Sequence, residues 1–143
     1  MYPLAHILFA ALLFKSLKIE KKYFLIFLIF SILPDIDFLI IQHRTVTHSI
    51  FIPLFFLFLF LIFKNNLFLA ISISLLSHIL LDIISGKVCI FCPINFWIGT
   101  NIFGNYRIYA EIFLPIIFFL LYYEDRRFIS FWNFKRSNRR IKK

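Results

Sequence analysis

The chain has 143 residues, of which 62% are hydrophobic and 16% are charged, and its formal net charge is +9. A soluble domain of this size has too little interior to hide so much apolar surface. The composition therefore excludes an ordinary soluble globular protein and favours a membrane protein. We expect one domain over residues 1–125, followed by a basic tail over residues 126–143.

Apolar runs and their breaks predict an all-α, polytopic membrane helical bundle with about five spans. Several runs are shorter than the ~20 residues that cross a bilayer unaided, which favours tilted helices or polar helix ends in a protein-lined pocket. The first run is followed rather than preceded by lysines, so we expect a helix of the mature protein and not a secretory signal. Residues 86–106 are expected to form an irregular loop at the membrane interface. The expected spans are residues 3–14, 23–41 (broken at Pro34), 49–63, 67–85 and 108–123.

Basic residues predict the orientation of this bundle. Thirteen of the 16 Lys and Arg residues fall on one face: four follow the first span, Lys64 follows the third, and eight lie beyond the fifth. The positive-inside rule places that face in the cytoplasm, with the N-terminus outside and the C-terminus inside. We expect the tail to be solvated beside lipid headgroups and expect no specific nucleic-acid partner.

Ionisable groups lie within or beside these apolar runs. All four histidines and four of the seven acidic residues do so, and such groups mark a functional site by default. At ~1.5 Å per helical residue, the polar groups of all five spans stand about 13–22 Å from the basic ends of their spans. They are therefore expected to meet in the outer half of the membrane. Imidazole and carboxylate groups are ligands of zinc and similar ions, so the pattern predicts a metal site.

Two pairs of these residues have informative spacing. His78 and Asp82 are four apart on an expected helix, so both project from one face. They could bind one ion, Asp82 could bridge two ions, or His78 could be a packing residue that is hydrogen-bonded to Asp82. Asp35 and Asp37 follow Pro34, and in an extended segment both carboxylates would point the same way. They could be ligands, or they could cap the end of a span.

Residues 43–49 offer two imidazoles, a guanidinium and three hydroxyls. His48 is the better ligand candidate, whereas His43 could be a ligand, a donor to a ligand or a general acid. Arg44 could bind an anionic phosphoryl group with two hydrogen bonds, or it could pair with one of the two aspartates after Pro34. The hydroxyls expected to cap the following span are Thr47 and Ser49.

Other polar residues carry weaker signals. His6 would ordinarily be a core histidine, but its matching depth favours a ligand. Arg107 and Glu111 are four apart and could form only an ion pair near the mouth of the site. Cys89 and Cys92 form a lone CxxC, which fits two unpaired thiols, a small disulfide or a peripheral metal contact.

Taken in order, these motifs resemble a known family. The chain resembles the YdjM-like (LexA-binding, inner-membrane-associated) metal-dependent hydrolases over residues 4–123. The motifs that carry the resemblance are an N-terminal His, Pro-Asp-Ile-Asp, His-Arg-x-x-Thr-His-Ser and Ser-His-x-x-x-Asp. That family is regarded as distantly similar to zinc-dependent phospholipase C. Thr45 stands where the family often has Gly, and Arg107 stands where the phospholipases have a His. By this resemblance the metal ligands are His6, Asp35 or Asp37, His48, His78 and Asp82.

The resemblance implies a multi-pass inner-membrane hydrolase that uses Zn²⁺ or another divalent metal. We expect it to hydrolyse a phosphoester such as a phospholipid headgroup, with membrane lipids as partners. Asp37 would be a ligand or general base, His43 an acid toward the leaving group, and Arg44 the group that holds the phosphate. The alternative is a non-catalytic membrane protein in which the polar cluster carries ions or protons, or only braces the helices.

Overall fold

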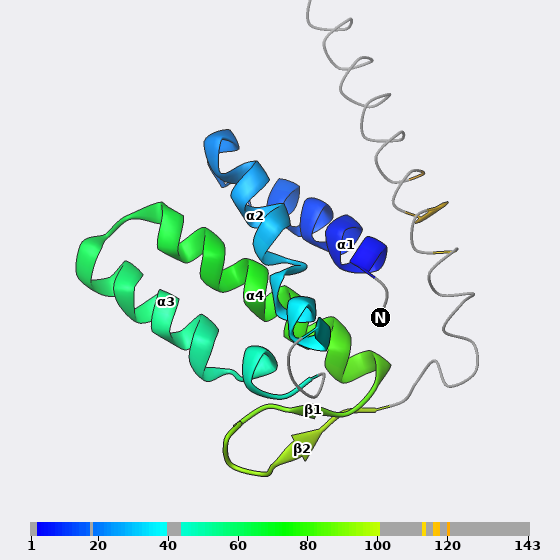
Figure 1. Ribbon diagram of the computed structural model, residues 1–143. Helices are drawn as coiled ribbons and strands as arrows, with labels where there is room; N and C mark the ends of the chain where they lie inside the picture. Colours follow the sequence, from blue (N-terminus) through cyan, green and yellow to red (C-terminus); the bar gives the residue numbers. More distant parts are fainter. Residues whose placement is uncertain are drawn as a thin grey trace, which may run out of the picture.

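The structure is a computed structural model that describes residues 3–17, 19–39 and 44–100, together with Phe113, Ile116, Ile117 and Leu120. Four α-helices and a short antiparallel hairpin make up the described fold (Figure 1). Helix α4 lies at the centre, with α1 and α3 on opposite sides of it, and α2 packs against both α1 and α4. The helices are α1 (Pro3–Ser16), α2 (Phe24–Phe30), α3 (Phe51–Phe63) and α4 (Asn66–Ser85).

Three short segments of 3-10 helix link these helices and carry part of the polar residues. They are η1 (Lys21–Tyr23), η2 (Leu33–Leu39) and η3 (Val46–His48). Helix α2 ends four residues before Pro34, whose ring removes an amide donor and disfavours helical geometry in the preceding residue. The chain then continues through η2, which places Asp35 just beyond the helix end.

Helices α3 and α4 form a helical hairpin through a tight connection. Lys64 closes α3 in the left-handed conformation, with φ of 51°, and its amide donates to the Phe60 carbonyl at 2.8 Å. Asn65 then caps α4, because its side-chain oxygen accepts from the Leu67 amide at 3.0 Å. This hairpin places the amino end of α3, and η3 before it, beside the carboxyl half of α4.

Serines on the buried face of α4 join it to the neighbouring helices. The Ser74 hydroxyl donates to the Phe27 carbonyl of α2, and the Ser72 hydroxyl donates to the Pro53 carbonyl of α3 at 2.9 Å. Small polar residues of this kind let apolar helices approach closely and hydrogen-bond across the contact. On the α1 side, Ala70 packs in an apolar cluster with Phe14 and Phe27.

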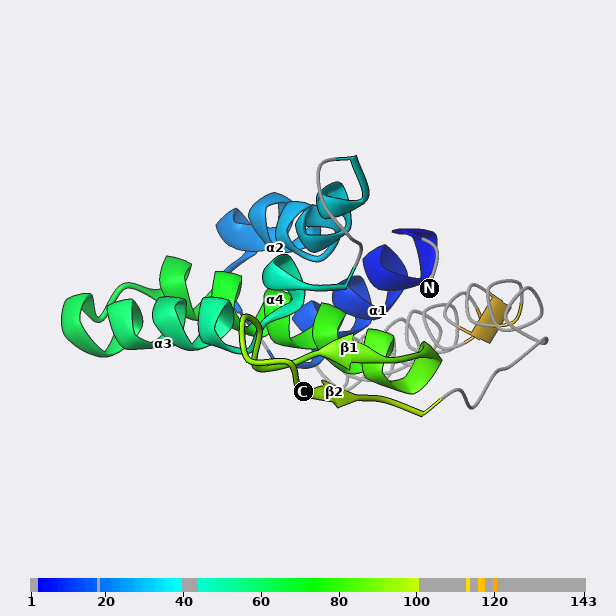
Figure 2. The same ribbon diagram turned by 60° about the horizontal axis from the view of Figure 1, so that its bottom comes forward.

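A hairpin of strands β1 (Val88–Cys89) and β2 (Trp97–Ile98) follows α4, with Val88 opposite Ile98 and Cys89 opposite Trp97. Seen from below, it lies beside the end of α4 that carries the polar residues (Figure 2). The hairpin closes tightly at Gly99, where φ is +156° and a Cβ would lie 1.9 Å from the Gly86 carbonyl oxygen. Only glycine fits this position.

The structure confirms the mostly helical fold but does not bear out five spans. Within the described residues only α4, with 20 residues, is long and apolar enough to cross a membrane; α1 and α3 are shorter apolar helices. The expected second span stops at Phe30 because Pro34 interrupts it. Most of the expected fifth span, residues 108–123, lies outside the described residues.

Candidate metal centre

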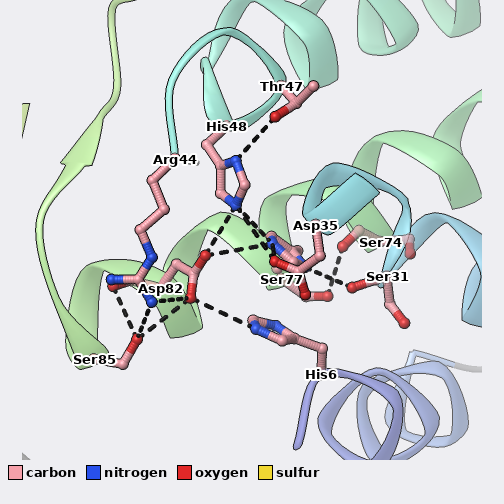
Figure 3. Close-up of polar contacts among 11 residues, drawn as sticks. His6, Ser31, Asp35, Arg44, Thr47, His48, Ser74, Ser77, Asp82 and Ser85 are labelled. Atoms are coloured by element: carbon pink, nitrogen blue, oxygen red, sulfur yellow. Dashed lines mark hydrogen bonds and ion pairs between the residues drawn. The ribbon is translucent and has the colours of Figure 1, made fainter. Parts of the chain in front are cut away.

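Four segments bring histidine and aspartate side chains together at the carboxyl half of α4. His6 comes from α1, Asp35 from η2, His48 from η3, and His78 and Asp82 from α4 (Figure 3). The side chains of the three histidines and Asp82 are fully buried, and that of Asp35 is 17% exposed. One ligand atom from each of His6, Asp35, His78 and Asp82 lies within 4.8 Å of the others.

Four of the side-chain heads lie close to the spacing of ligands around one metal ion. The Nε2 atom of His48 lies 3.0 Å from His78 Nε2 and 3.0 Å from Asp82 Oδ2. His78 Nε2 lies 3.4 Å from Asp82 Oδ2 and 3.5 Å from Asp35 Oδ1, which is 3.8 Å from His48 Nε2. Zinc bonds of ~2.0–2.2 Å to N and O ligands require ligand atoms roughly 3.3–3.6 Å apart in a tetrahedron. The cluster therefore fits one divalent ion.

The outer nitrogens of the two rings have partners that orient them. His78 Nδ1 lies 2.6 Å from the Ser31 carbonyl oxygen, which can only accept, so Nδ1 donates and the Nε2 lone pair points into the cluster. His48 Nδ1 lies 3.0 Å from the Thr47 hydroxyl. Metal-binding histidines are held in this way by a hydrogen bond to the other ring nitrogen.

His6 completes one side of the cluster. Its ring stacks on that of His78, with centroids 3.9 Å apart and planes 19° apart. Its Nε2 atom lies 3.6 Å from Asp82 Oδ1, and neither ring nitrogen has a hydrogen-bond partner among the described residues. A buried imidazole in this state is available to an incoming cation.

Arg44 contacts Oδ1 of Asp82, whereas His48 faces Oδ2. Its Nη2 atom lies 2.8 Å from Asp82 Oδ1 and 3.0 Å from the Ser85 hydroxyl. Arg44 has a left-handed backbone, with φ of 66°, and its carbonyl accepts from the Cys89 amide at 3.1 Å. The hairpin thus helps to hold Arg44 in a conformation that few non-glycine residues adopt.

The electrostatics of the cluster favour a cation. Burial lowers the pKa of His48, but the hydrogen bonds with Asp35 and Asp82 raise this pKa by more than burial lowers it. The net pKa of His48 therefore lies above its usual value. The two carboxylates thus stabilise positive charge at His48 Nε2. A proton or a metal ion can supply that charge.

The structure brings five of the predicted ligands together: His6, Asp35, His48, His78 and Asp82. The Asp37 side chain and all of His43, Arg107 and Glu111 lie outside what the structure describes. Sequence reasoning missed the Ser31 carbonyl and Ser85, because neither gave a signal of its own. Asp82 and Ser85 are described partners of Arg44, and a pair of Arg44 with Asp37 falls outside what the structure describes.

Ser49 partly fulfils the capping prediction before the third span. Its hydroxyl accepts from the amide of Phe51, the first residue of α3, at 3.4 Å, although Ile50 is the residue at the amino end of the helix. The same hydroxyl donates to the carbonyls of Cys92 at 3.0 Å and Ile90 at 3.3 Å, and so ties the η3 turn to the hairpin. Cys89 and Cys92 are both free thiols.

The fold and the cluster together define a mostly helical, strongly apolar protein with buried histidine and aspartate side chains at metal-ligand spacing. The chain belongs to the YdjM inner membrane protein family, whose model matches residues 1–135. This match confirms the family predicted from the motifs and makes the chain a membrane protein. No curated protein and no solved structure matches the chain. The more distant likeness to zinc-dependent phospholipase C therefore stays a prediction.

Proposed function

We propose that this protein is an integral membrane, metal-dependent hydrolase that acts on a phosphoester, with a phospholipid headgroup as the preferred substrate. The observation that carries the proposal is the convergence of His48, His78 and Asp82 beside the partly exposed Asp35, an arrangement that leaves a position for a water ligand, with the His78 ring oriented by a carbonyl. When bound there, Zn²⁺ or another divalent ion supplies a Lewis acid and lowers the pKa of a bound water toward ~7.

The protein's own groups would divide the remaining tasks. Asp35 is partly exposed at the cluster, so it can accept the proton of the attacking water. Asp37 is the other candidate for this role, on the basis of the sequence. His43 would donate a proton to the leaving group. Arg44 lies beside Asp82 with its side chain 13% exposed, close enough to the cluster to hold a phosphoryl oxygen.

The membrane arrangement is part of the same proposal. We propose a multi-pass arrangement in the inner membrane, with the basic C-terminus in the cytoplasm and the metal cluster toward the outer face. The 13 basic residues on one face support this orientation. The exposed aromatic side chains of the hairpin, among them Phe96 and Trp97, suit the membrane–water interface.

A second candidate function is favoured by the Arg44–Asp82 ion pair. The buried cluster already contains a cation and two carboxylates, so it could brace the helices, or carry protons, without a metal ion. The two candidates differ in one observable, because only the hydrolase needs the metal.

The test measures bound metal and phosphoester cleavage side by side on detergent-purified protein. We expect His78→Ala to lose both, and Asp82→Asn to bind metal much more weakly because it removes charge that offsets the dication. Ser77→Ala is the matched control, since Ser77 is buried next to His78 but its hydroxyl donates to the Ser74 carbonyl within α4. Wild-type protein that binds no metal and cleaves no lipid phosphoester would support the bracing or proton-carrying role instead.

A further inference from the structure

The two oxygens of Asp82 face different cations. Oδ2 lies within 3.4 Å of both His48 Nε2 and His78 Nε2, on the side of the proposed metal site. Oδ1 lies 2.8 Å from Arg44 Nη2 and 3.6 Å from His6 Nε2. A carboxylate shared between two metal ions uses its two oxygens in this way, one for each ion. In Figure 3 the Arg44 guanidinium lies beside Asp82 and Ser85.

We infer that Arg44 takes the place of a second metal ion and restricts the cluster to one divalent ion per chain. This inference rests on the proposed metal site and adds its stoichiometry. The Arg44 guanidinium stays charged at any physiological pH and cannot dissociate as an ion does. Its interaction with Oδ1 therefore satisfies that oxygen permanently, while Oδ2 remains directed at the ligand nitrogens.

Charge and backbone geometry support the same conclusion. The positive charge of one divalent ion and Arg44 together already exceeds the negative charge of the Asp35 and Asp82 carboxylates. Among the described residues no further carboxylate lies at the cluster to balance a second ion, and unbalanced positive charge in a buried site is costly. The left-handed backbone of Arg44, fastened to β1 through the Cys89 amide, holds the guanidinium in this position.

Ser85 identifies the second position more closely. Its hydroxyl lies 3.0 Å from Arg44 Nη2 and 3.3 Å from Asp82 Oδ1. Without the guanidinium, Asp82 Oδ1 and the Ser85 hydroxyl would face a vacated cationic position. These are few ligands, so a second ion would bind there more weakly than the first.

The experiment titrates metal-free, detergent-purified full-length protein with Zn²⁺ and counts bound equivalents. We expect one equivalent for wild type and for Arg44→Lys, which keeps the charge. Arg44→Gln should bind a second, weaker equivalent, and adding Ser85→Ala to that variant should remove the second equivalent only. Lys87→Gln is the control, because it removes a positive charge from an exposed position on the hairpin.

Two results would overturn the inference: two or more equivalents in wild type, or a single equivalent in folded Arg44→Gln. The wild-type count tests the inference even if Arg44→Gln fails to fold. A complete lack of Zn²⁺ binding by wild type would refute the proposed metal site itself, and the inference with it. The failure of the inference and the failure of the proposed function are thus distinguishable.

Discussion

At the scale of single residues, the candidate site depends on its predicted ligands and equally on the hydrogen-bond partners that orient them. The His78 ring is oriented by a backbone carbonyl, and the His48 ring by the hydroxyl of its neighbour Thr47. The ligands themselves could be predicted from the sequence, because ionisable groups in apolar runs are rare and expensive. The Ser31 carbonyl could not be predicted, because every residue has a carbonyl and only the packing of α2 against α4 selects this one.

Thr47 provides a test of this orienting role. We predict that Thr47→Val lowers the affinity for Zn²⁺ by about 10- to 100-fold, because the His48 ring loses the hydrogen bond that fixes its position. Thr47→Ser keeps the hydroxyl and should restore the affinity. Isothermal titration of the purified variants measures both values. Equal affinities for Thr47→Val and wild type would show that the hydroxyl does not position the ring.

At the scale of secondary-structure elements, the hairpin after α4 is fastened to the turn that carries Arg44 and His48. The Cys89 amide donates to the Arg44 carbonyl, and the Ile50 amide donates to the Ile90 carbonyl at 2.8 Å. The sequence predicted an irregular loop here, because glycines and a proline interrupt the apolar pattern. Two-residue strands carry too little periodicity to be recognised. The link between hairpin and site depends on contacts between segments about 40 residues apart, which no local pattern reveals.

The neck of this hairpin gives the prediction at this scale. Gly99→Ala should open the hairpin, because the added Cβ would lie 1.9 Å from the Gly86 carbonyl oxygen and the φ of +156° is strained for alanine. We expect a lower thermal unfolding temperature in detergent and weaker Zn²⁺ binding. The matched control is Lys87→Ala, an exposed position on the same hairpin. If Gly99→Ala unfolds at the wild-type temperature and binds Zn²⁺ as wild type does, the hairpin does not support the site.

At the scale of the whole molecule, the membrane class followed from composition, but the number of spans did not. A seven-residue α2 and a 13-residue α3 are too short to cross a bilayer upright, at ~1.5 Å per residue. Apolar runs in sequence do not distinguish a spanning helix from a short helix packed on α4. Proline and 3-10 turns, which set the real helix ends, were only partly visible in the pattern.

The basic asymmetry nevertheless predicts an orientation. In a background with Cys89→Ser and Cys92→Ser, we expect Ser137→Cys to resist membrane-impermeant thiol labelling in intact cells. Thr100→Cys should react, because the positive-inside rule places the basic tail in the cytoplasm and the end of the hairpin outside. Detergent-solubilised cells provide the control in which both positions react. The reverse pattern in intact cells would contradict the orientation.

The central claim is that the buried histidines and aspartates hold a divalent ion, and X-ray absorption at the zinc edge of the zinc-loaded protein tests it most directly. If the proposed site is correct, the metal has a shell of nitrogen and oxygen ligands at ~2.0–2.2 Å that includes imidazole scattering. This shell should be lost in His78→Ala. A shell with sulfur at ~2.3 Å would place the metal at Cys89 and Cys92 instead. That result, or an unchanged spectrum in His78→Ala, would show that the buried histidines and aspartates do not hold the ion.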